Sequence, residues 1–110
     1  MDDCIFSAAQ GDLRELGGGV RRRVRSYNGA IMGVEVDFDE GGIGAPHTHP
    51  HTQLTYCLSG EFEFTSGGQK HILRAGDTLL FPAGTEHGCV ALKAGRLFDV
   101  FTPARQDFLG

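Results

Sequence analysis

The chain has 110 residues with ten basic and fourteen acidic side chains, and its net charge of −4 leaves no basic surplus for binding nucleic acid. This length suffices for one domain with a buried core, and no apolar run approaches the length of a membrane span. The acidic start, Met1-Asp2-Asp3, lacks the positive charge of a signal peptide, and the three scattered cysteines are typical of thiols in a reducing compartment. We therefore expect a cytoplasmic protein.

Short alternating apolar runs separated by glycine-rich turns predict an all-β domain over residues 20–110, preceded by an N-terminal segment over 1–19. Within that segment, residues 7–16 carry the one weak helical pattern. The basic run at 21–25 alternates in a way that predicts a solvent-exposed strand face. The expected strands are 20–24, 30–38, 53–58, 61–64, 69–73, 78–81, 87–92 and 96–102. Strands of this length and spacing are typical of a sandwich or barrel.

Four polar side chains fall at the spacing of metal ligands, and they are His47, His49, Gln53 and His87. The first three share the parity of one extended strand, in which residues two apart point to the same side, and the fourth would come from a neighbouring strand. Pro50 interrupts this stretch and could redirect His51, which has the same parity. Three nitrogens and one amide oxygen would hold a divalent ion, with positions open for water or substrate. The competing interpretation is that these histidines are ordinary polar residues in a loop. His71, the fifth histidine, lies in a polar hairpin strand, and we expect it to be exposed.

Two segments carry the motifs of a known superfamily. The first cupin motif, G-x5-H-x-H-x3/4-E-x6-G, is matched by Gly41, His47, His49, Gln53 and Gly60, with glutamine in place of glutamate. The second, G-x5-P-x-G-x2-H-x3-N, is matched by Gly76, Pro82, Gly84 and His87, with Ala91 in place of asparagine. The chain thus resembles the cupin superfamily from about residue 20 to residue 102. The resemblance implies a jelly-roll β-barrel.

The glutamine in the first motif affects the expected chemistry. Iron oxygenases commonly combine two histidines with one carboxylate, whose charge supports the higher oxidation state of iron. A neutral Gln53 leaves the divalent charge uncompensated, which favours Lewis-acid chemistry over redox cycling. Neutral ligands tolerate nickel, zinc, cobalt, manganese or iron. An oxygenase that works with three histidines stays open as an alternative.

The C-terminal strand ends in a motif with a carboxylate and an arginine. Asp99 shares a face with Leu97 and Phe101, so periodicity alone allows either an exposed edge residue or a functional carboxylate that lines a cavity. Arg105, beyond Pro103, would by default lie on the surface.

The run H-x-H-P-H-x-Q together with this tail, D-x-F-x-P-x-R-x-D-F-L, resembles the KdgF-type small cupins of pectin and alginate breakdown. The resemblance implies conversion of 4,5-unsaturated uronate monosaccharides to linear 4-deoxy-5-keto uronates. It also implies metal ligation by His47, His49, Gln53 and His87, and places Asp99, Phe101 and Arg105 in the active site. Asp99 would act as general acid or base, Phe101 would cover a sugar face, and Arg105 would hold the uronate carboxylate.

Two other functions fit the same motifs. One is an iron(II) dioxygenase with three histidines, which would consume oxygen. The other is a sugar-binding cupin without catalysis, which would not require Asp99 as an acid–base group. In each case we expect a homodimer, because residues 20–27 form a strand that reads as a sheet edge a partner could cover.

Overall fold

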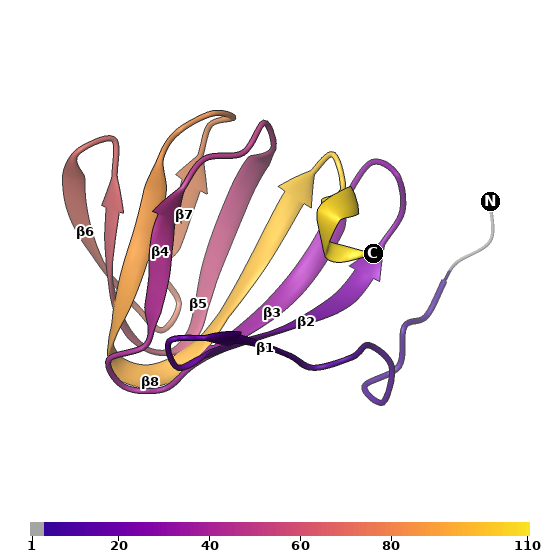
Figure 1. The fold of residues 1–110 in the computed structure, drawn as a ribbon, viewed down its shortest axis with the longest axis horizontal. Helices are drawn as coiled ribbons and strands as arrows, with labels where there is room; N and C mark the ends of the chain where they lie inside the picture. Colours follow the sequence, from indigo (N-terminus) through magenta and orange to yellow (C-terminus); the bar gives the residue numbers. More distant parts are fainter. Residues whose placement is uncertain (1–3) are drawn as a thin grey trace.

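The structure, a computed structural model, describes residues 4–110 as one antiparallel arrangement of eight strands (Figure 1). The strands are β1 (Arg14–Gly17), β2 (Val20–Tyr27), β3 (Met32–Phe38), β4 (Ile43–His47), β5 (Thr52–Ser66), β6 (Gln69–Arg74), β7 (Thr78–Phe81) and β8 (His87–Thr102). The main path of pairing is β1-β2-β3-β8-β5-β6, while β4 pairs with β8 and β7 pairs with β5. The prediction of a single all-β domain is confirmed.

The long strands β5 and β8 hold the two sides of the molecule together. Figure 1 shows β4, β6 and β7 on one side and β2 and β3 on the other, with β5 and β8 running through both. On β3, residues of even number face inward, so Met32, Val34, Val36 and Phe38 are buried, while the residues between them are partly exposed. This period of two is the one expected for a strand with one buried face. The core lies between the two sides and includes Phe62, Phe81 and Leu97.

Two pairs of predicted strands are each one continuous strand. Residues 53–58 and 61–64 belong to β5, and 87–92 and 96–102 belong to β8. The glycines that predicted turns instead allow the two strands to bend against each other. Gly60 has a φ of 84°, and a Cβ there would lie 2.7 Å from the Ala94 carbonyl oxygen, so only glycine fits. The register shifts around Ser59 mark the same bend.

The weak helical pattern at residues 7–16 is wrong as a prediction. That stretch contains a turn and the start of β1, which pairs with β2. In the part of the chain that the structure describes, the one helical element is the 3-10 turn η1 (Gln106–Phe108), and no helix there is long and apolar enough to cross a membrane. The strand at 20–27 was expected to be a sheet edge. This prediction is wrong for residues 20–22, because β1 pairs with them.

The basic run on β2 divides between the two faces of the strand. Arg21 forms an ion pair with Asp39 at 3.0 Å, and Arg25 forms one with Glu35 at 3.0 Å. These two arginines fit the predicted outer face. Arg22 has the opposite parity and shares the inner face with the buried Val20 and with Val24, which packs on the core. The predicted solvent-exposed strand face therefore includes Arg21 and Arg25 but not Arg22.

Candidate active site

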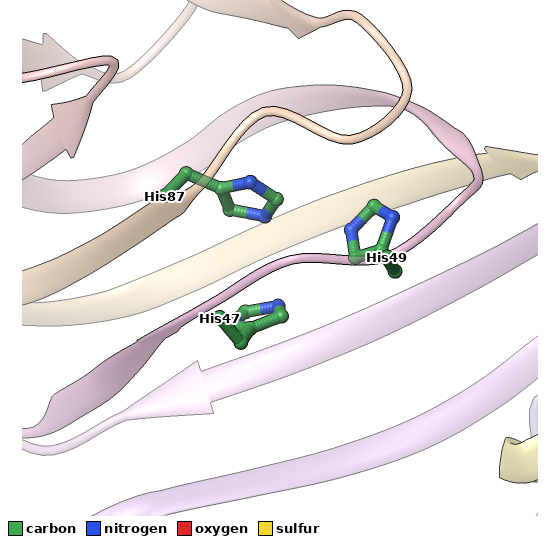
Figure 2. Close-up of side chains that lie close together, drawn as sticks. All are labelled: His47, His49 and His87. Atoms are coloured by element: carbon green, nitrogen blue, oxygen red, sulfur yellow. The ribbon is translucent and has the colours of Figure 1, made fainter.

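The four predicted metal ligands come together at one end of the barrel. They come from the end of β4 (His47), the loop after it (His49), β5 (Gln53) and the start of β8 (His87). His47 and His87 face each other in the pairing of β4 with β8. Figure 2 shows the three imidazole rings gathered around one space, and one nitrogen from each lies within 4.8 Å of the others. The prediction missed β4 itself, which a strand search passes over because Gly44 and Pro46 interrupt it.

Gln53 completes the cluster through its amide oxygen. Oε1 of Gln53 lies 2.9 Å from Nε2 of His49 and 3.1 Å from Nε2 of His87. His51 stands outside the cluster: its backbone oxygen accepts a hydrogen bond from His49, and its ring packs edge-on against the His49 ring without joining the converging nitrogens. The structure therefore brings together the four predicted residues without His51.

The hydrogen bonds of the three rings fix where their lone pairs point. Each Nδ1 lies 2.8 to 3.0 Å from a backbone carbonyl oxygen, those of Ala45, His51 and Thr85. A carbonyl can only accept, so each Nδ1 donates and each neutral ring leaves Nε2 without a proton. Two such Nε2 lone pairs point at the Gln53 oxygen, which is also an acceptor. Acceptors that converge in this way could hold a cation between them, and the donor set fits a divalent metal.

Burial favours the neutral forms of His49 and His87. Desolvation lowers the pKa of His87 to about 4, against a partly compensating hydrogen bond to Thr85, and it also lowers the pKa of His49. The ring of Phe81 stacks on His87 with centroids 4.2 Å apart, which holds the imidazole in place. Lone pairs on both rings are thus available for a metal below pH 6.5, the ordinary pKa of histidine.

A hydrogen-bonded chain runs from Gln53 to Asp99. The Gln53 amide nitrogen donates to Oγ1 of Thr55 at 3.0 Å, and the Thr55 hydroxyl donates to Oδ1 of Asp99 at 2.7 Å. Thr55 is fully buried, so both contacts lie away from solvent. These two hydrogen bonds orient the Gln53 amide so that its oxygen faces His49 and His87. Sequence reasoning missed Thr55, although it shares the inward parity of Gln53.

Asp99 lines a cavity and is not an edge residue. It lies on β8 between Val34 of β3 and Thr55 of β5, in the middle of the sheet. Burial raises the pKa of Asp99 to about 6, although the hydrogen bond from Thr55 opposes this shift. A carboxyl group with a pKa near neutrality, beside a candidate metal centre, is suited to proton transfer.

The cavity has a volume of about 450 Å³, within the range of about 300–1,000 Å³ common for small-molecule sites. It connects the metal cluster to the C-terminal tail, and its lining includes His47, Gln53, His87, Asp99, Phe101 and Arg105. Phe101 is buried and its ring contacts His49. Arg105 is not a free surface residue, because its side chain is 11% exposed and forms a two-point ion pair with Asp107.

Two further cavity residues were absent from the prediction. Arg22 and Phe108 both line the cavity, and the guanidinium carbon of Arg22 lies 3.8 Å from the centre of the Phe108 ring. The signal for Arg22 was its position between Val20 and Val24 on the inner face of β2.

Comparison with known proteins agrees with this geometry. A family model of the cupin domain matches residues 34–101, more than half of the chain. The pectin degradation protein KdgF of Dickeya dadantii (strain 3937) is 41% identical over 97 residues, which cover 86% of this chain and 88% of that protein.

Solved structures give the same result. The structure of KdgF from Halomonas sp. has a TM-score of 0.90 and 34% identity, covering 97% of this chain and 99% of that one. An RmlC-like cupin from Shewanella frigidimarina NCIMB 400 also has a TM-score of 0.90, with 36% identity and coverage of 97% and 96%. The chain therefore belongs to the cupin family, as a small single-domain cupin of the KdgF type.

Proposed function

We propose that this protein is an isomerase that converts 4,5-unsaturated uronate monosaccharides to linear 4-deoxy-5-keto uronates. The observation that carries the proposal is that a candidate metal centre, a carboxyl group and an arginine all line one cavity. The likeness to KdgF of Dickeya dadantii, a protein named for pectin degradation, supports the substrate class. Free thiols at Cys57 and Cys89 are in keeping with a cytoplasmic location.

The reaction needs a proton transfer and no oxidant. The Asp99 carboxylate accepts the proton of the C1 hydroxyl, the bond between C1 and the ring oxygen breaks, and that oxygen stays on C5 as an enolate. Protonation at C4, with the proton that Asp99 received, gives the ketone and restores the carboxylate. Atoms and charge balance, and the product is an isomer of the substrate.

The other residues position the ligand. Arg105 holds the uronate carboxylate, and Phe101 covers an apolar face of the sugar and excludes water. A divalent ion held by His47, His49, Gln53 and His87 would supply Lewis-acid stabilisation of negative charge on ligand oxygens. The neutral donor set accommodates nickel, zinc, cobalt, manganese or iron.

Incubation with an unsaturated uronate monosaccharide tests the proposal. We expect the ultraviolet absorbance of the C4=C5 bond to disappear faster with the metal-loaded protein than without protein, since the product lacks that bond. The spontaneous rate without protein is the control. No acceleration with any of the five divalent metals would refute the isomerase, and oxygen consumption confined to iron would favour the dioxygenase instead.

We also propose that the protein is a homodimer. An apolar row crosses the outer face of three strands where Leu80 of β7, Leu54 of β5 and Val100 of β8 lie side by side, with Tyr56 and Phe98 in a neighbouring row. Leu80 is 62% exposed and Leu54 is 40% exposed, so this face has apolar area for a second copy to cover.

Light scattering at micromolar concentration should therefore give the mass of two chains. Leu80→Lys places a charge in the apolar row and should shift the protein toward the monomer, while Leu13→Lys, at a residue exposed in the N-terminal segment, should leave the mass unchanged. A monomeric mass for the unmodified protein would contradict the dimer.

A further inference from the structure

Arg22 is a cation on the inner face of the barrel. It lies on β2 between Val20 and Val24, where the strand turns its side chains toward the core. It borders the cavity of about 450 Å³ that holds the candidate metal centre, and also a neighbouring cavity of about 270 Å³. Phe108 borders both cavities as well, so the stacked pair forms the wall between them.

The charge of Arg22 has no partner of opposite sign in direct contact. Among residues 4–110, no carboxylate lies within ion-pair distance of Arg22 and no group accepts a hydrogen bond from its guanidinium. Its contact is the stack on Phe108. Burial lowers the pKa of Arg22, because the cation loses water that no carboxylate replaces. The N–H groups of this side chain are thus open to a ligand.

Arg105 approaches the same aromatic ring. Its guanidinium carbon lies 4.2 Å from the centre of the Phe108 ring, and that of Arg22 lies 3.8 Å from the same centre. Both guanidinium groups therefore lie close to this one ring. Asp107 occupies the Nε–Nη2 edge of Arg105 at 3.0 and 2.8 Å. Arg22, Arg105 and Asp107 together carry one positive charge in excess, and Arg14, which pairs with Arg22 across β1 and β2, adds a further positive charge nearby.

We propose that Arg22 is a second binding residue for the ligand's carboxylate, which it holds together with the free edge of Arg105. A carboxylate offsets this positive surplus, and the planar guanidinium of Arg22 offers the paired donors that a carboxylate accepts best. The metal cluster and Asp99 border the same cavity, so a sugar acid anchored here would present its remaining oxygens to them. The identification of the natural ligand as a uronate rests on the proposed function; the role of Arg22 in holding a carboxylate does not.

Binding of two saturated sugars to the metal-loaded protein tests this role. Galacturonate and galactose differ in the carboxylate at C6 and lack the C4=C5 bond, so neither measurement depends on turnover. By calorimetry, we expect the unmodified protein to bind galacturonate more tightly than galactose. Arg22→Met should weaken galacturonate binding by about tenfold to a hundredfold, as expected for loss of a charged hydrogen-bonding partner, without weakening galactose binding.

Arg23→Met is the matched control, because it removes the same charge from the next residue of β2, which faces the other way. It should leave both affinities unchanged. Metal content and the midpoint of thermal unfolding should match the unmodified protein, and Arg22→Gln is the second neutral variant if Arg22→Met does not fold. Unaltered galacturonate affinity in the neutral Arg22 variant, or no preference for galacturonate in the unmodified protein, would overturn the proposal and leave the turnover assay standing.

Discussion

Replacing His87 with alanine is expected to abolish stoichiometric binding of a divalent metal and to lower turnover of unsaturated uronate by about a hundredfold or more. His87 is 3% exposed, and its Nε2 points at the Gln53 oxygen, so its loss opens the cluster on the side of β8. Metal content by elemental analysis and the initial rate of absorbance loss measure the two effects. The unmodified protein should also unfold at a higher temperature when metal is added, since a ligand at a hundred times its Kd contributes about 2.7 kcal/mol.

Two other histidines provide the controls. His71→Ala changes a partly exposed residue on β6, and His51→Ala changes the histidine that lies outside the cluster. Both variants should bind one metal ion per chain. Full metal content in His87→Ala, or loss of metal in His51→Ala, would show that the ligand set is wrong.

Alternation and motif spacing were enough to predict the fold class and the residues that meet at the cluster. The inward positions of β3 follow from its period of two, and the motif spacing identified His47, His49 and Gln53, although these lie on β4, a loop and β5 and not on the one extended strand that was expected. The sequence did not predict that β5 and β8 are each one long strand. That continuity depends on Gly60 and Gly95 meeting across the sheet. A single segment carries no information on which distant glycine it will contact.

The parts of the site that went unpredicted depend on register between strands. Thr55 joins Gln53 to Asp99 because β5 and β8 pair Thr55 with Asp99 directly, and no local pattern specifies that pairing. Arg22 was hidden by its neighbours, since the four arginines of residues 21–25 look alike until the strand assigns them to faces. Asp107 was also missed as the partner that occupies one edge of Arg105. Local chemistry thus identified the donors, and tertiary pairing decided their partners.

Asp99→Asn is expected to lower kcat by about a hundredfold or more with little change in KM, because the amide keeps the shape of the side chain but cannot accept the proton. The asparagine oxygen can still accept the hydrogen bond that Thr55 donates at 2.7 Å, so the Gln53 amide should keep its orientation and the metal should stay bound. Steady-state kinetics on unsaturated uronate and elemental analysis of the variant measure the two outcomes. Asp39→Asn is the matched control, since it neutralises a carboxylate with a side chain 64% exposed and should turn over normally.

The pH dependence of turnover provides an independent check on Asp99. If its carboxylate accepts the first proton, the ionised form is active, and kcat should fall as the pH drops through the pKa of this group. Burial raises that pKa from 3.8 to about 6, and a nearby divalent cation favours the ionised form, so the loss of activity should lie between these two values. The residual activity of Asp99→Asn should not show this fall in kcat at low pH, because the amide does not titrate. Normal turnover by Asp99→Asn, or the same fall in kcat at low pH in that variant, would assign the proton transfer to another group.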